Sequence, residues 1–347
     1  MPEARAYAAA SPNAPLAPTT IPRREPGPKD VTIEIAYCGI CHSDVHTARG
    51  EWGAGIFPVV PGHEIAGRVT AVGRKVKKLK VGDLAGVGCM VNSCRECANC
   101  RKGLEQHCLG RTSFTYNSTE QDGKTPTYGG YSSHIVVDED FALKIKKGLP
   151  LERVAPLLCA GITTYSPLKR FGARKGSRVG VLGLGGLGHM AVKIAAAMGA
   201  EVYALSGSPS KRADAKALGA KHFVLTSDAA RLTELAGRLD LIVDTVSGTH
   251  DVNVLLGLLK TAGTLVMVGA SPKPHEVSSF SLIMGRRTLA GSLIGGVAET
   301  QEMLDFCARK NVLADVEVVA AKDINAAYER MLKSDVRYRF SIDAKTL

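Results

Sequence analysis

The chain has 347 residues, 45% of them hydrophobic and 22% charged, which is typical of a soluble globular protein with room for two domains. The formal net charge is +11, but the basic residues are scattered along the chain, so the charge does not favour nucleic acid as a partner. No apolar run resembles a signal peptide or reaches the roughly 20 residues of a membrane helix, so we expect a cytoplasmic protein with reduced thiols.

The first 150 residues are rich in glycine, proline and short β-branched runs. The segments 31–40, 63–73 and 129–145 have the pattern of strands. Turn-forming residues separate these runs, which is typical of a mostly-β domain with long loops. We therefore predict a first domain over residues 1–151.

From residue 152 the pattern changes to strands alternating with helices. The pattern of residues 177–205 predicts a strand, a glycine turn, a helix and a second strand, and that of residues 211–225 predicts a helix followed by a strand. Further apolar strands are expected at 239–246 and 263–270. This alternation predicts a parallel, doubly wound sheet over residues 152–292, and thus an α/β fold. We expect residues 293–347 to fold back on the first domain and complete it.

A glycine-rich turn follows the first strand of this second region. Gly183, Gly185 and Gly188 have the G-x-G-x-x-G spacing, with Gly186 and Leu187 between them. Glycine permits the tight turn and lets backbone N–H groups approach a pyrophosphate at the N-terminus of the next helix. The segment predicts a dinucleotide site, the alternative being a glycine turn without a ligand.

The tip of the next strand indicates which dinucleotide is bound. An NAD site usually has an acidic residue there, whereas this chain has Ser206, followed by Ser208, Lys211 and Arg212. A serine can donate to a 2′-phosphate, and the two cations can add charge-assisted contacts. We therefore predict NADP(H). In the alternative interpretation the cations only face water.

Four cysteines lie within fifteen residues, at Cys94, Cys97, Cys100 and Cys108. Four thiolates at this spacing can close a tetrahedral Zn²⁺ shell and leave no position for substrate, so we predict a structural zinc site. An iron–sulfur cluster is the chemical alternative.

A second, separated set consists of Cys41, His63 and Cys159. Two cysteines and a histidine are the ligands of a catalytic zinc with one open position. From spacing alone this set is open to the alternative that His63 is structural. Cys38, Cys89 and Cys307 match no ligand position and are expected to be small buried hydrophobic residues.

The whole chain resembles the zinc-dependent medium-chain alcohol dehydrogenases, and within them the cinnamyl-alcohol-dehydrogenase-type NADP(H) aldehyde reductases. The motifs "CGICHSDVH", "GHE", the four-cysteine loop, "APLLCAG", "GLGGLGH" and "GSLIG" carry the resemblance. It implies a GroES-like catalytic domain and a Rossmann coenzyme domain. It also implies two zinc ions per chain, NADP(H), a small-molecule alcohol or aldehyde substrate and a homodimer, without nucleic acid or a membrane as partners.

The resemblance assigns roles to individual residues. It makes Cys41, His63 and Cys159 the catalytic zinc ligands, with Glu64 able to approach the metal and Asp44 hydrogen-bonded to the ring of His63. Ser43 would bond the substrate oxygen and His46 would pass its proton to solvent, unless Ser43 merely caps a turn and His46 is a surface histidine. The cofactor contacts that it implies are Thr163, Ser206, Ser208, Lys211, Val268, Gly269, Ser292 and, at the pyrophosphate, Arg339.

These expectations predict an oxidoreductase that transfers hydride between NADP(H) and a primary alcohol/aldehyde pair, chiefly as an aldehyde reductase. Trp52 and Phe114 are expected to line the substrate pocket, which favours aryl or medium-chain aldehydes. The alternatives are a polyol or sugar dehydrogenase on the same scaffold, which would want an acid at position 206, and a zinc-free quinone reductase, which lacks both cysteine sets. A zinc-finger nucleic-acid module is a third alternative, but it needs a basic recognition helix beside the zinc.

Overall fold

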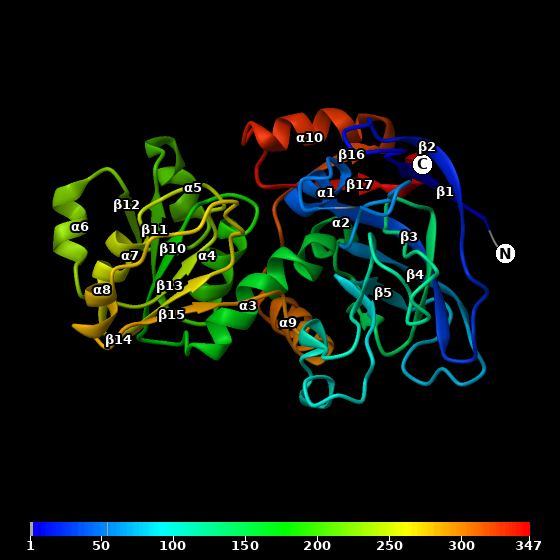
Figure 1. Cartoon of the computed structure of the whole chain (residues 1–347), viewed down its shortest axis with the longest axis horizontal. Coiled ribbons are helices and arrows are strands. Elements are labelled where there is room, and N and C mark those ends of the chain that lie inside the picture. The colour runs from blue at the N-terminus through cyan, green and yellow to red at the C-terminus, as the bar shows by residue number, and fades with distance from the viewer. Residues whose placement is uncertain (1–2, 54) are drawn as a thin grey trace. The chain divides into compact units, whose positions relative to one another are not determined.

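The computed structural model describes residues 3–53 and 55–347 (Figure 1). The chain forms two compact units. The first comprises the residues up to Cys159 together with Gly295–Leu347, and the second comprises Ala160–Ile294. The first unit is thus built from both ends of the chain.

The centre of the first unit is a seven-stranded sheet in the order β16-β17-β3-β4-β5-β9, with β8 also paired to β3. In β3 (Asp30–Ile40), Val31, Ile33 and Ile35 are buried while Glu34 faces solvent, so the period of two places the β-branched residues in the core. The other strands of this unit are β1 (Glu3–Ala8), β2 (Ala17–Pro22), β4 (Ile65–Val72), β5 (Leu84–Val87), β6 (Met90–Asn92), β7 (Ser113–Phe114), β8 (His134–Asp138), β9 (Leu143–Lys144), β16 (Val316–Ala320) and β17 (Arg339–Asp343). Its helices are α1 (His42–Ala48), α2 (Leu151–Val154), α9 (Val297–Lys310) and α10 (Ile324–Leu332).

The short helices at 151–158 belong to the first unit. Helix α2 and the 3-10 turn Ala155–Leu158 contact β3, β4 and β17, and Val154, Leu157 and Leu158 are buried there. Because these apolar side chains pack on the first sheet, the chain enters the second unit at Ala160 rather than at the expected residue 152. It leaves the second unit after Ile294, close to the expected residue 292.

The second unit contains a six-stranded parallel sheet in the order β12-β11-β10-β13-β14-β15. The doubly wound sheet predicted from the sequence is therefore present, and the strand order reverses between β10 and β13, where folds of this kind bind ligands. Its strands are β10 (Arg178–Leu182), β11 (Glu201–Ser206), β12 (His222–Leu225), β13 (Leu239–Asp244), β14 (Leu259–Met267) and β15 (Thr288–Gly291). Its helices are α3 (Ala160–Arg170), α4 (Gly188–Ala197), α5 (Arg212–Ala217), α6 (Ala229–Leu235), α7 (Val252–Leu258) and α8 (Ser279–Ile283).

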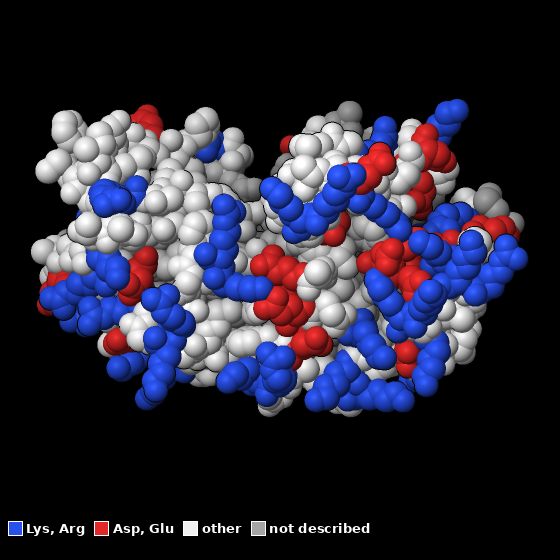
Figure 2. All heavy atoms as spheres, turned by 90° about the horizontal axis from the view of Figure 1, so that it is seen from below, with Lys and Arg blue, Asp and Glu red and all other residues white. Residues whose placement is uncertain are grey.

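The surface carries charges of both signs. On the face drawn in Figure 2, Lys and Arg side chains are interspersed with Asp and Glu side chains. This distribution differs from the continuous basic groove that a nucleic-acid-binding protein presents. Within residues 3–53 and 55–347, every helix is too short or too polar to cross a membrane.

Candidate metal and cofactor sites

Four side chains that could hold a metal ion meet in the first unit. Cys41, His63, Glu64 and Cys159 are all buried, and one candidate ligand atom from each lies within 4.8 Å of the others. The two sulfur atoms are 4.0 Å apart, close to the separation of about 3.8 Å that two thiolates have on one tetrahedral Zn²⁺. The structure therefore brings together the separated set that the sequence suggested, and its donor atoms suit zinc.

Three elements deliver these ligands. Cys41 is the N-cap of α1, His63 and Glu64 immediately precede β4, and Cys159 ends the 3-10 turn before α3. The pKa of Cys41 lies well below its usual value, because the Cys159 thiol and the charge of Arg339 stabilise the thiolate. The lowered pKa favours the ionised form of Cys41 that a metal requires.

Asp44 connects α1 to the histidine of this cluster. Its carboxylate accepts a hydrogen bond from the backbone N–H of Cys41 at 2.8 Å, which caps the helix, and lies 3.5 Å from Nδ1 of His63. With Nδ1 directed at Asp44, Nε2 is the ring nitrogen left for a metal. The family resemblance implies a hydrogen bond here; the structure shows the two groups in contact, and the bond stays a prediction.

The hydroxyl and imidazole expected in proton transfer lie along α1. Oγ of Ser43 is 3.6 Å from Sγ of Cys41, so the hydroxyl is at the metal cluster. His46, further along the helix, has Nδ1 paired to the carboxylate of Glu51, and its ring stacks on Trp52 at a centroid distance of 4.9 Å. His46 is therefore a partly exposed histidine with two defined partners, and its role in proton transfer stays a prediction.

Arg339 occupies a different environment from the one expected. Its guanidinium forms an ion pair with Glu64, and it is only 3% exposed. Burial alone would lower the pKa of Arg339, but the charge of Glu64 raises it above the usual arginine value. Burial raises the pKa of Glu64 to about 7, although the charge of Arg339 acts in the opposite direction. Contact between Arg339 and a pyrophosphate stays a prediction.

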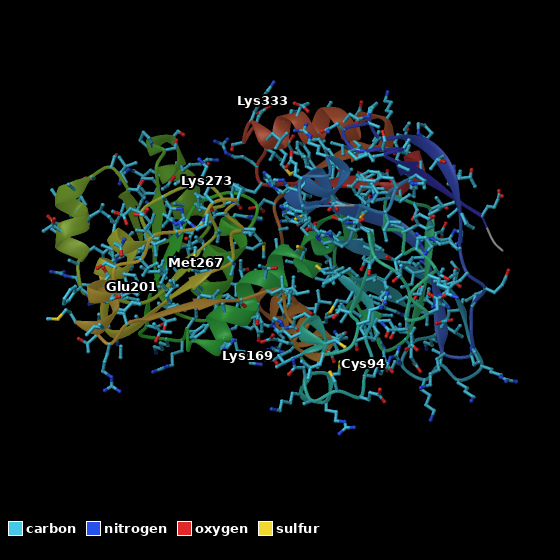
Figure 3. The ribbon with its side chains drawn as sticks, in the orientation of Figure 1. Cys94, Lys169, Glu201, Met267, Lys273 and Lys333 are labelled. Carbon is cyan, nitrogen blue, oxygen red and sulfur yellow. The ribbon has the colours of Figure 1, made fainter. Side chains whose placement is uncertain are left out.

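The four-cysteine loop forms a second cluster, with ligand atoms from Cys94, Cys97, Cys100 and Cys108 within 4.8 Å of one another. Figure 3 labels Cys94 on this loop. Backbone N–H groups of Cys100 and Leu109 each donate to Sγ of Cys97 at 3.4 Å, and these donors lower the pKa of Cys97 to about 6. The loop thus stabilises a thiolate at neutral pH, as a closed zinc shell needs.

The loop is attached to the C-terminal part of the same unit. Glu105 accepts a hydrogen bond from the backbone N–H of Val297 at 3.1 Å, at the start of α9. A Cβ atom on Gly296 would lie 1.8 Å from the carbonyl oxygen of Gly103, so only glycine permits this close approach. The loop therefore packs on α9 through a polar contact and a backbone contact.

In the second unit the glycine-rich turn joins β10 to α4. Gly183 has φ +88°, and a Cβ on Gly188 would lie 2.1 Å from the carbonyl oxygen of Gly183, so both positions require glycine. A Cβ on Gly185 would meet nothing within 4 Å. The turn therefore has open space at the glycine where a pyrophosphate would approach the backbone. Gly186 and Leu187 lie between this glycine and the first residue of α4.

The loop predicted to choose the cofactor begins at the same edge of the sheet. Ser206 ends β11 and accepts a hydrogen bond from the backbone N–H of Ser208 at 3.2 Å, while Ser208 and Ser210 share a hydrogen bond of 2.8 Å. Lys211 ends a 3-10 turn, and the guanidinium of Arg212 lies over the ring of Phe223 at 4.8 Å. The loop is thus folded by its own serines, with the two cations following it.

The other expected cofactor residues occupy separate elements. Val268 and Gly269 follow β14, just beyond Met267 (Figure 3), and both donate backbone hydrogen bonds to the carbonyl of Asp244. Ser292 follows β15, so these residues lie at the carboxyl ends of parallel strands, where Gly183 and Ser206 also lie. Thr163 is buried on α3.

The two aromatic residues expected in the substrate pocket are on the surface of the first unit. Trp52 is 59% exposed beside His46, and Phe114 is 39% exposed on β7. A cavity of about 300 Å³ in the same unit is lined by other residues, among them Arg23, Glu120 and Tyr128. None of the expected metal or cofactor residues lines that cavity, so it is separate from the candidate sites.

Sequence reasoning missed several side chains around the metal cluster. Glu51 pairs with His46, the ring of Tyr116 stacks on His63 at 5.6 Å, and Tyr131 donates to Asp44. Only Glu51 could have been predicted from the local sequence, because it follows His46 by five residues at the end of a short helix.

Of the three cysteines expected to be buried, Cys38 and Cys307 are buried, whereas Cys89 is partly exposed.

The fold and these two clusters define a class, namely a zinc-dependent dehydrogenase with a Rossmann-type coenzyme domain. Residues 27–147 match the alcohol dehydrogenase GroES-like domain, and residues 186–309 match the zinc-binding dehydrogenase domain. The chain is 57% identical to the NADP-dependent alcohol dehydrogenase C 1 of Mycolicibacterium smegmatis over 99% of this chain and 98% of the relative.

Two solved structures are similar over almost the whole chain. The cinnamyl alcohol dehydrogenase SbCAD4 from Sorghum bicolor has a TM-score of 0.96, and the CAD from Helicobacter pylori, complexed with NADP(H), has a TM-score of 0.93. Both are 45% identical in sequence and cover 99% of this chain and 98% of their own. The chain therefore belongs to the zinc-dependent medium-chain alcohol dehydrogenases, as the sequence motifs indicated, and is an oxidoreductase of that family.

Proposed function

We propose that this protein reduces aryl or medium-chain aldehydes with NADPH, and oxidises the corresponding primary alcohols in the reverse direction. The observation that carries the proposal is the buried Cys41–His63–Cys159 cluster with the hydroxyl of Ser43 beside it. The relative from M. smegmatis, an NADP-dependent alcohol dehydrogenase, supports the reaction and the cofactor.

Two zinc ions per chain fit the two clusters. The four-cysteine loop would hold a structural zinc, and Cys41, His63 and Cys159 would hold a catalytic one, with Glu64 near enough to approach it. When bound, the catalytic zinc supplies Lewis-acid polarisation of the substrate oxygen.

NADP(H) fits the second unit. Gly185 has open space beside its backbone, and the N-terminus of α4 supplies N–H groups for a pyrophosphate. Ser206 stands where an NAD site usually has an acidic residue, which removes one source of repulsion for a 2′-phosphate, and Ser208 and Lys211 follow within the same loop. The NADP(H) complex of the H. pylori enzyme supports this choice.

Residues of α1 would transfer the proton between the substrate oxygen and solvent. The hydroxyl of Ser43 would donate to the substrate oxygen as negative charge develops there, and His46 would exchange the proton with solvent. Glu51 holds Nδ1 of His46, so Nε2 is the nitrogen that exchanges the proton with solvent. Trp52, stacked on His46, and Phe114 would form aromatic walls for the substrate, which favours aryl or medium-chain groups.

A homodimer is the assembly that we propose. Phe280, Ile283 and Met284 are 68–78% exposed on and next to α8, and β15 is an uncharged edge strand of the six-stranded sheet. An edge strand and an exposed apolar helix in one unit suit pairing with a second copy of the chain.

The nine free cysteines also fit a reducing compartment such as the cytoplasm.

The reaction is tested by initial rates on a panel of aryl, aliphatic and sugar aldehydes with NADPH and NADH, together with metal analysis. We expect two zinc per chain and preference for NADPH. A Cys41→Ser variant should lose one zinc and its turnover, yet still bind NADPH, because the coenzyme unit is intact. One zinc or none in the native enzyme, or a preference for sugars with NADH, would contradict the proposal.

A further inference from the structure

Asp44 is a fully buried carboxylate that accepts three hydrogen bonds and contacts the ring of His63. Its Oδ2 accepts from the backbone N–H of Cys41 at 2.8 Å and from the hydroxyl of Tyr131 at 3.1 Å. Its Oδ1 accepts from the backbone N–H of Gly62 at 3.1 Å and lies 3.5 Å from Nδ1 of His63. Tyr131 is the one side-chain donor among them besides the histidine, and it comes from the loop before β8.

The hydrogen bond of Tyr131 continues to a second phenol. A carboxylate can only accept, so the hydroxyl of Tyr131 donates its proton to Asp44. The oxygen of Tyr131 then accepts a hydrogen bond from the hydroxyl of Tyr328, 3.4 Å away on α10. Tyr131 is completely buried and Tyr328 is 5% exposed. Burial and the charge of Asp44 raise the pKa of both phenols well above the usual value, so both keep their protons.

We infer that Tyr131, supported by Tyr328, is a positioning residue that fixes Asp44 and through it the ring of His63, and so sets the affinity of the catalytic metal site. The inference rests on the proposed function, because it takes Cys41, His63 and Cys159 to be zinc ligands. It extends the site by two tyrosines that are distant in sequence from every ligand.

The hydroxyl of Tyr131 holds the carboxylate together with the backbone N–H groups of Cys41 and Gly62. Nδ1 of His63 lies 3.5 Å from Asp44, a long contact, so the ring alone does not hold the carboxylate. The donors on Oδ2 set its rotation. On another side of the ring, Tyr116 stacks on His63 with the planes 13° apart. Histidine ligands depend on such partners for ring orientation and basicity.

The test is metal release from the native, zinc-loaded enzyme to the chelator 4-(2-pyridylazo)resorcinol. We expect two phases, one for each cluster, and the Cys41→Ser variant, which should hold only the four-cysteine zinc, assigns them. Tyr131→Phe keeps the ring and removes the hydroxyl. It should accelerate the catalytic-site phase by about tenfold, as the loss of partners behind a metal ligand typically does, and leave the other phase unchanged.

Two further variants provide a second test of the inference and a control. Tyr328→Phe should accelerate the same phase by a smaller factor, and it serves alone if Tyr131→Phe fails to fold. Tyr203→Phe is the matched control, because Tyr203 also donates to a carboxylate, that of Glu201 at 3.4 Å in the second unit, and it should change neither phase.

The outcomes separate the two claims. An unchanged catalytic-site phase in Tyr131→Phe, or equal acceleration of both phases, would overturn the positioning role and leave the proposed function intact. A native enzyme whose release matches that of Cys41→Ser would instead remove the catalytic metal, and with it both the proposed function and this inference.

Discussion

Arg339 and Glu64 form an ion pair in which the arginine is 3% exposed and the glutamate is completely buried. The pair joins the first residue of β17 to the residue that follows the candidate ligand His63. Nε of Arg339 and Oε2 of Glu64 are buried without a hydrogen-bond partner. Each charge therefore depends strongly on the other, and the side chains of Cys41 and Cys159 also face Arg339.

Removing one member of this pair should destabilise the enzyme more than removing both. Arg339→Met leaves the carboxylate of Glu64 buried without its counter-charge, and should lower the free energy of unfolding by about 3 kcal/mol. The double variant Glu64→Gln/Arg339→Met should recover most of that loss, because no unpaired charge remains. Urea unfolding followed by circular dichroism measures the cycle. An Arg339→Met enzyme that is as stable as the native one, but has a raised KM for NADPH, would assign Arg339 to the cofactor instead.

Ser206→Asp should reverse the preference for NADPH. The new carboxylate ends β11, where the 2′-phosphate is expected, and repulsion should raise the KM for NADPH by about 100-fold, or about 2.7 kcal/mol. The KM for NADH should change little, because its ribose hydroxyls can donate to the acid. Thr233→Asp on α6 adds the same charge away from the loop and controls for net charge. Equal losses with both cofactors would show that the loop does not select between them.

The Cys97→Ser variant should bind one zinc fewer per chain, and its four-cysteine loop should lose its ordered structure. Cys97 is the thiol with two backbone donors, and its ionised form suits a closed metal shell. Without it, we expect half the zinc, a lower thermal midpoint and rapid proteolysis between residues 94 and 110, since the loop has little core of its own. Cys307→Ala, which alters a buried cysteine outside both clusters, should keep both metals. Full zinc content in Cys97→Ser would contradict the structural-site assignment.

Contacts between residues close together in the sequence could be predicted from their spacing, whereas contacts between distant residues could not. The four-cysteine site lies within fifteen residues, so its spacing was enough. Cys41 and Cys159 are 118 residues apart, and the packing of the 3-10 turn Ala155–Leu158 on β3 brings them together, so they were assigned through a family resemblance. Glu64 and Arg339 are 275 residues apart and were given separate roles, because neither motif contains the other. Tyr131 and Tyr328 had no signal, since a buried tyrosine is also ordinary core.

Arg24→Gln should destabilise the enzyme only above about pH 4. Two nitrogens of Arg24 bond the two oxygens of Asp30. Burial acts to raise the pKa of Asp30, but the bonds from Arg24 and Gly27 outweigh it and hold the pKa below its usual value.

The sign of this effect follows from linkage. A carboxyl whose folded pKa is depressed adds stability that is present above its unfolded pKa of about 4 and lost as the pH falls further. At pH 7 the loss should be about 1 kcal/mol, because the side chain of Arg24 is 32% exposed and partly screened. Urea unfolding of both proteins from pH 7 to 3 should show the difference shrinking. A difference that stays constant with pH would exclude the ion pair as its cause.

Charge on α8 should separate the proposed dimer into monomers. Met284, directly after the helix, is 78% exposed, and Phe280 within it is 73% exposed. A lysine at each position would have to be desolvated in an interface between two copies, which costs far more than the apolar contact gains. The double variant Phe280→Lys/Met284→Lys should therefore elute at half the native mass in size-exclusion chromatography with light scattering. Val81→Lys, at a residue that is 60% exposed in the first unit, should leave the mass unchanged. A double variant that remains a dimer would place the interface elsewhere, whereas a native enzyme that is already a monomer would refute the proposed assembly itself.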